Sequence, residues 1–280
     1  MECKKCNSPL EDYLRNCEVC QFDNGFPNVR IALKVEEFSA LTKRHDEAST
    51  HTEARNCREI LESFEREISR SNAVICKDLS VVWNLVSSDN IVYKSFNKQV
   101  GSGLKLPSGS YWDFARPIVE ATIFPYYADE IIYAALSIND RGLYNYGDYH
   151  IILNEDYIRD RASVFEENSI LFCKKHKIIV GDKIRPGYRS TWEERAKLAG
   201  AKLHSKLDDK SKLSDYPQIL LSPGKTSEDD NFLEVHIYGG IHRRAIKKVI
   251  GPEPKKGERA LKQSVEKKLK EVGATFEILT

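Results

Sequence analysis

The chain has 280 residues, 43 of them basic and 42 acidic, so its formal net charge at pH 7 is only +1. This length is enough for a substantial hydrophobic core in one large domain or two ordinary ones. The near-neutral balance gives no global attraction to nucleic acid or to an anionic membrane, although local basic clusters remain. No apolar run approaches about 18 residues, and the start "MECKKCNSPL" lacks a signal-peptide pattern, which together predict a cytoplasmic protein.

The first predicted element is a cysteine cluster. Four of the seven cysteines form two CxxC knuckles separated by ten residues: Cys3, Cys6, Cys17 and Cys20. Two tight turns that each present a pair of thiolates close a tetrahedral site suited to structural zinc. Segment 1–30 therefore resembles a zinc ribbon, a module that contacts nucleic acid, a protein partner or another domain of its own chain. The three remaining cysteines are isolated among apolar neighbours and are predicted to be buried thiols: Cys57, Cys76 and Cys173.

Residues 31–72 follow as a predicted helical connector. In its second half, apolar side chains recur at three- and four-residue spacings: Cys57, Ile60, Leu61, Phe64 and Ile68. This spacing predicts a helix with one apolar face, and a weaker repeat before it predicts one long helix or two helices end to end. The apolar face would pack within the chain, or it would mediate self-association or bind a partner.

From residue 73 onward, short strands and helices follow one another without strict alternation, which predicts an α+β domain over residues 73–280. Strands are expected over residues 73–76, 90–96, 130–138, 149–154, 162–165, 169–173, 216–222, 232–239 and 275–279. Helices are expected over residues 78–88, 155–161, 191–207, 242–251 and 257–273, with 111–127 helical in part and a Gly/Ser/Pro-rich loop over 101–110. The motifs GxGxxG, GxxxxGK[ST], HExxH and GxSxG do not occur, which argues against Rossmann, P-loop, zincin and α/β-hydrolase chemistry.

Polar side chains interrupt the apolar strands at two places before residue 170. Tyr93 and Lys94 lie at the end of a predicted strand, and "RDRASVFEENS" brings Arg161, Ser163 and Ser169 close to the next strands. An arginine with nearby hydroxyl groups is suited to binding a phosphate or pyrophosphate through charge-assisted hydrogen bonds. Both places are therefore candidates for an anionic ligand.

A third polar cluster lies in the strand predicted over residues 232–239. Glu234 and His236 are two residues apart, so they project from the same face of that strand. A lone carboxylate on a strand can polarise a hydroxyl group or stabilise a positively charged transition state. Purely structural interpretations remain open: Glu234 ends an acidic turn, and His236 is a hydrogen-bonded structural histidine.

In their order, the three clusters resemble the ADP-ribosyltransferase superfamily over residues 90–250. "FLEVHIYGGIHRRAIKKVI" is similar to the glutamate strand and following helix of bacterial toxin and phage-defence members. "YGDYHIILNEDYIRDRASVFEENSI" is similar to their segment with an Arg-x-Ser element and a later serine. The resemblance implies an α+β fold of two small, split mixed sheets that hold NAD in a cleft, here preceded by the zinc ribbon and the connector. It also implies transfer of ADP-ribose from NAD to a macromolecular acceptor.

The resemblance assigns roles to particular residues. Glu234 matches the catalytic glutamate, which stabilises the oxocarbenium ion as nicotinamide leaves. Ser163 matches the strand hydroxyl that orients this glutamate or the ribose. Arg161 would bind the phosphates of NAD, and Ser169 would contact nicotinamide.

The chain departs from the family at two positions. Tyr93 and Lys94 stand where the family carries a first-strand Arg or His, and Lys94 can pair with pyrophosphate but lacks the bidentate fork of arginine. His236, expected to be catalytic together with Glu234, stands where arginine-modifying members carry a second Glu or Gln. The expected acceptor is therefore a nucleic acid or protein group other than arginine. The alternative function is a non-enzymatic zinc-ribbon adaptor that binds nucleic acid or a protein partner.

Overall fold

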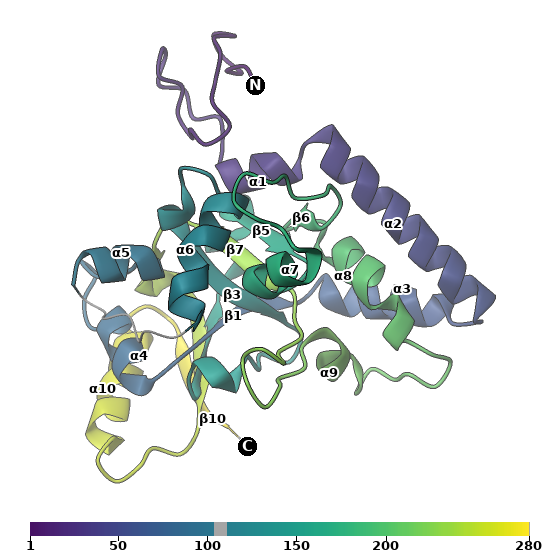
Figure 1. Cartoon of the computed structure of the whole chain (residues 1–280). Coiled ribbons are helices and arrows are strands. Elements are labelled where there is room, and N and C mark those ends of the chain that lie inside the picture. Colours follow the sequence, from purple (N-terminus) through teal and green to yellow (C-terminus); the bar gives the residue numbers. More distant parts are fainter. Residues whose placement is uncertain (104–110, 280) are drawn as a thin grey trace.

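In the computed structural model, which describes residues 1–103 and 111–279, a large sheet lies between helices and the cysteine-rich segment extends away from it beyond α1 (Figure 1). Most of the loop predicted over residues 101–110 falls outside the described residues. The strands are β1 Asn72–Lys77, β2 Val92–Tyr93, β3 Ile131–Ser137, β4 Tyr149–Leu153, β5 Ala162–Phe165, β6 Arg189–Thr191, β7 Glu234–Tyr238, β8 Ile241–His242, β9 Ile246–Gly251 and β10 Thr275–Ile278.

The α-helices are α1 Pro27–Ala32, α2 Val35–Ala54, α3 Arg58–Ile68, α4 Leu79–Val86, α5 Phe96–Gly101, α6 Tyr111–Ile123, α7 Ser169–His176, α8 Arg195–Leu203, α9 Tyr216–Leu220 and α10 Arg259–Lys270. Short 3-10 turns are η1 Ala128–Glu130, η2 Tyr144–Tyr146, η3 Glu155–Tyr157, η4 Arg159–Arg161, η5 His204–Lys206 and η6 Arg243–Ala245. No helix in the described part of the chain is both long and apolar enough to cross a membrane.

Eight strands form one mixed, mostly antiparallel sheet in the order β10-β9-β4-β1-β3-β7-β5-β6. Its parallel pair is β9 with β10, and α10 supplies the crossover that a parallel pair needs. The strands β2 and β8 form a separate two-stranded sheet. The predicted α+β class is confirmed at this level, but the described strands form one large sheet and a two-stranded one, where two small, split sheets were expected.

The two central strands of the large sheet stay paired over only three residue pairs. β1 and β3 pair from Asn72–Ser137 to Val74–Ala135. Beyond that point β1 continues alongside β4, while β3 continues alongside β7. The sheet therefore opens between the second half of β1 and the first half of β3, and this opening positions the candidate site.

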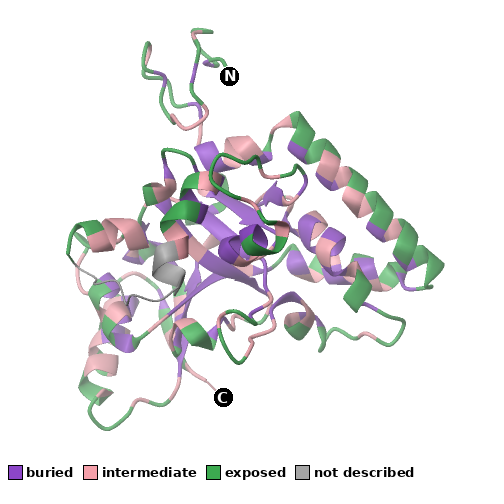
Figure 2. Cartoon of the chain, viewed as in Figure 1, coloured by how far each residue is buried: buried purple, intermediate pink, exposed green. Residues whose placement is uncertain are grey.

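Helices cover both faces of the sheet, and most residues of its strands are buried, except in the edge strand β10 (Figure 2). On one face, residues of α3, α4, α8 and α10 share a core with alternate residues of the strands. On the other face, α6 and α7 pack on β3 and β5. Leu61, Phe64 and Ile68 of the connector belong to the first of these cores, so the predicted apolar helical face packs within the chain. The connector consists of two successive helices, α2 and α3, one of the two predicted forms.

The sequence assigned three elements to the wrong type. Residues 169–173 and 216–222 were expected to be strands but form α7 and α9, because a short apolar run does not distinguish a strand from a buried helix. Residues 242–251 were expected to be a helix but form η6 and β9. There, Ile246, Val249 and Ile250 are buried along β4, so sheet packing outweighs the helical spacing of the charges.

A buried histidine in β4 makes the stability of the fold sensitive to acid. His150 is fully buried, and its Nδ1 accepts a hydrogen bond from the Gly142 N–H at 2.8 Å, so that nitrogen is unprotonated. Burial lowers the pKa of His150 to about 4, and the charge of Arg141 contributes in the same direction. Protonation therefore favours the unfolded chain, where the histidine has its ordinary pKa.

We expect the free energy of unfolding to fall as pH is lowered from about 6.5 to about 4, by at most about 3 kcal/mol from His150. His150→Asn places an amide oxygen near the position of Nδ1 and cannot titrate, so its unfolding free energy should lose this part of the pH dependence. Urea unfolding of both proteins at pH 7 and pH 5 measures the difference. An equal fall in unfolding free energy between pH 7 and pH 5 in wild type and variant would contradict the assignment to His150.

Candidate functional site

The opening between β1 and β3 contains a cavity of about 850 Å³. Its walls are the diverging halves of these two strands, α4, residues 91–96, α6 and the start of α7. Sites for small molecules and cofactors typically have volumes of about 300–1,000 Å³. The sheet therefore holds a space of cofactor size at the point where its two central strands separate.

The carboxylate of Glu234 lies in the wall of this cavity and is held by several donors. Its Oε2 accepts hydrogen bonds from the Ser169 backbone N–H at 2.9 Å and from the Ser169 hydroxyl group. His236 Nε2 lies 2.9 Å from the same oxygen, and Asn168 Nδ2 lies 3.3 Å from Oε1. Glu234 is 5% exposed, so its position is fixed by these contacts and not by solvent.

The start of α7 explains why the carboxylate is stable in a buried position. Asn168 caps this helix, because its Oδ1 accepts from the backbone N–H groups of Ile170 and Leu171 at 3.0 and 3.2 Å. The free N–H of Ser169 then points at Glu234. The first N–H groups of a helix have no partner within the helix and favour a negative charge. Glu234 satisfies this requirement at α7.

His236 lies beside Glu234 on β7, as the two-residue spacing predicts, but it is buried behind the cavity wall. It is 2% exposed and is not part of the cavity lining. Its ring packs against three aromatic rings, those of Phe124, Tyr133 and Phe165, with centroid distances of 4.8, 5.3 and 5.6 Å. In the tautomer with a proton on Nε2, His236 donates to Glu234 and is a positioning residue.

The predicted cofactor-binding residues separate into two groups. Tyr93, Lys94 and Ser169 line the cavity together with Glu234. Arg161 and Ser163 do not line it. The guanidinium group of Arg161 donates to the backbone carbonyls of Tyr157, Tyr238 and Gly240, at 2.8, 2.6 and 3.1 Å. The Arg161 donors therefore bond to backbone carbonyls, and not to a phosphate of NAD as the resemblance implied.

Ser163 was expected to orient Glu234, but its hydroxyl group bonds to a residue of α1 instead. It pairs across the sheet with His236, and its hydroxyl group accepts from Asn28 Nδ2 at 3.2 Å. The hydroxyl group bonded to Glu234 is that of Ser169, which was expected to contact nicotinamide. The predicted orienting role thus shifts from Ser163 to Ser169, because residues 169–176 form a helix and not a strand.

A polar pair in α6 also lines the cavity, although sequence patterns did not mark it as a candidate. Arg116 and Glu120 are one helical turn apart, with Arg116 Nη1 and Glu120 Oε1 separated by 3.2 Å. Burial raises the pKa of Glu120, and the charge of Arg116 and the amide of Asn97 oppose that rise. No motif marks these residues, since a pair at i and i+4 in a helix resembles an ordinary surface ion pair. Arg116 adds a cation to the cavity that Arg161 does not supply.

The four N-terminal cysteines form a second candidate site, which could hold a metal ion. Their Sγ atoms all lie within 4.8 Å of one another, with Cys3–Cys20 and Cys6–Cys17 separations of 3.6 Å. A tetrahedral ion with bonds of about 2.3 Å requires sulfur separations of about 3.8 Å. The cluster therefore has the dimensions of a four-thiolate metal centre.

The two knuckles that carry these cysteines have the same backbone geometry. Cys3 N–H donates to the Ser8 carbonyl and Cys17 N–H donates to the Phe22 carbonyl, both at 2.9 Å. The residue after each second cysteine is left-handed, Asn7 with φ 57° and Gln21 with φ 58°. Equal turns present equal pairs of thiolates, which is the arrangement expected from the repeated CxxC spacing.

A short helix connects the cysteine segment to the strand that carries Glu234. Arg30 of α1 donates to the backbone carbonyls of Gly25, Asp12 and Leu14, at 2.7, 2.9 and 2.6 Å. Two residues before Arg30, Asn28 donates through Nδ2 to the carbonyl oxygen of His236 at 3.0 Å and to that of Arg161 at 3.1 Å. Helix α1 thus contacts the knuckles on one side and β5 and β7 on the other.

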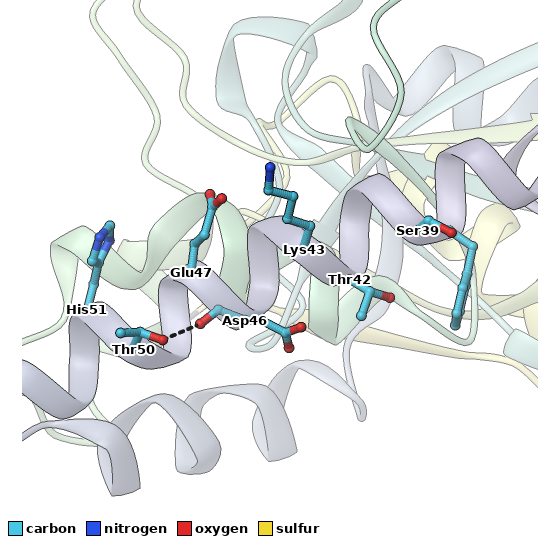
Figure 3. Close-up of a pocket in the computed structure, with 8 residues that line it drawn as sticks. Ser39, Thr42, Lys43, Asp46, Glu47, Thr50 and His51 are labelled. Carbon is cyan, nitrogen blue, oxygen red and sulfur yellow. Dashed lines mark hydrogen bonds between the residues drawn. The ribbon is translucent and has the colours of Figure 1, made fainter.

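A shallow hollow on the outer face of α2 is not a comparable site (Figure 3). Within the described part of the chain, its lining comes from that helix alone: Phe38, Ser39, Thr42, Lys43, Asp46, Glu47, Thr50 and His51. The Thr50 hydroxyl group donates back to the Asp46 carbonyl at 2.9 Å. Ligand sites enclose most of a small molecule's surface, and one exposed helix cannot do so.

Two substitutions of Asn168 separate its role in α7 from its role at Glu234. Asn168→Ala removes the cap and the donor, so we expect the free energy of unfolding to fall by about 0.5–2 kcal/mol. Asn168→Asp keeps the cap but places a second carboxylate where the amide now lies 3.3 Å from Glu234 Oε1. Urea unfolding compares the two variants. If Asn168→Asp were as stable as wild type, the contact of Asn168 with Glu234 would be unimportant for stability.

Comparison with protein-family models and with curated proteins finds no match to this chain. The functional assignment therefore depends on the two sites themselves. The first is a fixed carboxylate in a cofactor-sized cavity, and the second is a cluster of four thiols.

Proposed function

We propose that the protein transfers ADP-ribose from NAD to a macromolecular acceptor and releases nicotinamide. One observation carries this proposal: the Glu234 carboxylate is held by donors from Ser169, His236 and Asn168 in the wall of a cavity of about 850 Å³. The resemblance of residues 90–250 to ADP-ribosyltransferases supports it, since Glu234 matches the catalytic glutamate of that family. In this proposal NAD binds in the cavity where the large sheet opens, and not between two small sheets as in the family.

The chemistry requires a fixed negative charge next to a developing positive one. As the bond between nicotinamide nitrogen and the ribose C1′ breaks, positive charge builds on the ribose ring. A carboxylate that is already oriented stabilises this charge without reorganising in the transition state. Among the described residues, Glu234 Oε1 accepts one hydrogen bond, from Asn168 at 3.3 Å, and it keeps acceptor capacity for a ribose hydroxyl group. The acceptor nucleophile then bonds to C1′ and its proton passes to solvent.

The cations of the cavity are suited to the phosphates of NAD. Lys94 and Lys77 line the cavity and form no ion pair among the described residues. Arg116 lies deeper and already pairs with Glu120. Charge-assisted hydrogen bonds from lysine and arginine are the usual way to bind a pyrophosphate. In this proposal Lys94 keeps the phosphate-binding role expected of it, and Lys77 and Arg116 take the role expected of Arg161.

We propose zinc as the ion of the cysteine cluster. Thiolate ligands, a tetrahedral arrangement and four protein donors are typical of structural zinc, and a fully ligated ion leaves no open position for catalysis. Cys3, Cys6, Cys17 and Cys20 would hold the ion and keep the knuckles folded. The ion takes no part in the transfer step.

Incubation of the purified protein with NAD and a cell extract tests the proposed activity. Free nicotinamide is measured by chromatography, and the macromolecules are searched by mass spectrometry for added ADP-ribose. Nicotinamide release together with a labelled acceptor is the expected result. If no NAD is bound and no nicotinamide appears with protein, RNA or DNA present, the proposal fails. Nucleic-acid binding without NAD cleavage would instead support the adaptor function.

A further inference from the structure

Positive charge is concentrated near the C-terminus of a chain that is neutral as a whole. Residues 243–270 contain eleven lysines and arginines but only three acidic residues, while the whole chain carries +1. Residues 1–25, the cysteine segment, have the opposite balance, with three basic and five acidic residues. An anionic partner is therefore attracted to the C-terminal region and not to the cysteine segment.

Helix α10 presents much of this charge to solvent. Val265 and Leu269 are its buried residues. On its exposed side, Arg259, Lys267 and Lys270 form no ion pair with any described residue. This basic face extends from Arg259 to Lys270, which is about 17 Å along the helix axis at a rise of about 1.5 Å per residue. By contrast, Lys262 and Lys268 are paired with Glu266 and Glu271.

Contacts of η6 join the end of α10 to the rim of the Glu234 cavity. Arg243 bonds to Asp89 Oδ1 at 2.6 Å, to the Val86 carbonyl at 3.2 Å and to Glu271 Oε2 at 3.1 Å. Val86 ends α4, which packs beside α10, and the chain continues from Asp89 into residues 91–96 of the cavity wall (Figure 1). The last turn of α10 therefore lies next to the segment that carries Lys94.

We propose that the acceptor of the transferred ADP-ribose is a nucleic acid, bound by its phosphates along the basic face of α10. This inference rests on the proposed transferase function for the reaction but not for the binding. A row of unpaired cations on a helix suits a phosphate backbone, whose charges repeat along the strand. A single-stranded segment is favoured, because a base must leave any stack to reach a cavity in the protein. There, a base nitrogen or oxygen bonds to C1′ as the bond to nicotinamide breaks, and the base loses a proton to solvent.

Fluorescence anisotropy measures the binding in the absence of NAD. The probes are labelled 20-nucleotide single-stranded DNA and RNA and a DNA duplex, each titrated at several salt concentrations. The test protein is the triple variant Arg259→Gln, Lys267→Gln, Lys270→Gln, whose side chains are exposed. The matched control removes three exposed lysines from distant loops: Lys210→Gln, Lys212→Gln and Lys225→Gln.

We expect wild type and control to bind single strands with a steep salt dependence. In the triple variant, the slope of log K against log salt should shrink by about 2–3, because each lost phosphate contact removes about 0.7–0.9. Affinity at low salt should fall at least tenfold. Equal binding by triple variant and wild type overturns the proposal, as does binding to anionic phospholipid vesicles but to none of the three nucleic-acid probes.

The two proposals fail in different ways. Glu234→Gln should bind the probes as wild type does, because Glu234 does not lie on α10. If the probes bind through α10 but no NAD is cleaved, the transferase function fails and the binding surface stands. If nicotinamide is released and only proteins in the extract acquire ADP-ribose, the nucleic-acid acceptor is wrong and the transferase function stands.

Discussion

Glu234→Gln is expected to lower the rate of nicotinamide release from NAD by about 10²–10³-fold or more, which is the typical loss when one electrostatic stabiliser of a transition state is removed. Glutamine keeps the shape of the side chain but not its charge, so the positive ribose loses its nearest counter-charge. Rates are measured by chromatography of nicotinamide under saturating NAD. Glu253→Gln, at an exposed position, is the matched control and should retain full activity.

The structural contribution of Glu234 must be separated from its role in catalysis, because the carboxylate also satisfies the start of α7. In Glu234→Gln, an amide group would face either the Ser169 N–H or the Asn168 amide, both of which are donors. An unmatched buried donor costs about 1–3 kcal/mol, so the variant should unfold at lower urea concentration.

Adding Asn168→Asp to Glu234→Gln supplies an acceptor for that amide and should recover stability. If the double variant is stable but inactive, the charge of Glu234 is needed for the reaction. If stability and activity return together, Glu234 serves only to satisfy the start of α7, and the catalytic role proposed for its charge is wrong. Circular dichroism at each urea concentration gives the stability of every variant.

Removal of the metal ion is expected to have the largest effect on folding. The purified protein should contain about one zinc per chain, and Cys17→Ser should contain almost none. Zinc binding contributes about 10–16 kcal/mol in small zinc-finger peptides. The cysteine segment has a core of only a few side chains, centred on Cys3, Leu10 and Cys17, so it cannot remain folded without the ion.

Loss of the ion should destabilise α1 as well as the two knuckles. Arg30 would lose its three carbonyl partners in residues 12–25, and Asn28, which contacts the His236 carbonyl, lies in the same helix. Metal analysis and hydrogen exchange of residues 1–32 measure both effects. Cys57→Ala is the control, because Cys57 is a buried thiol far along the sequence from the cluster. A Cys17→Ser protein with full zinc content and unchanged exchange would contradict the predicted site.

Several features followed from local spacing and were confirmed. Glu234 and His236 share a face because side chains alternate along a strand, and the four cysteines meet because each CxxC turn brings its own pair together. Cys57, Cys76 and Cys173 are buried, as isolated thiols among apolar neighbours should be. The helical stripe of α3 packs inside the chain, where its spacing placed an apolar face.

The partners of Glu234 could not be read from spacing. Residues 169–173 look like a strand because they are short and apolar, and only the Asn168 cap makes them the start of α7. Because these residues form a helix, the hydroxyl group that orients Glu234 belongs to Ser169 and not to Ser163. Arg116 was missed for a related reason, since its pattern with Glu120 is common on solvated helices and its burial arises only when α6 packs on the sheet.

By itself, the sequence determined the four-thiol cluster, the shared face of Glu234 and His236 and the basic excess of residues 243–270, because these depend on positions close together in the chain. Only the tertiary structure decided which residues from distant parts of the chain contact these features. Ser169 reaches Glu234 across 65 residues, and Arg243 reaches Asp89 across 154. Such contacts depend on which strands pair and where the sheet divides, and strand pairing is set by packing of the whole chain.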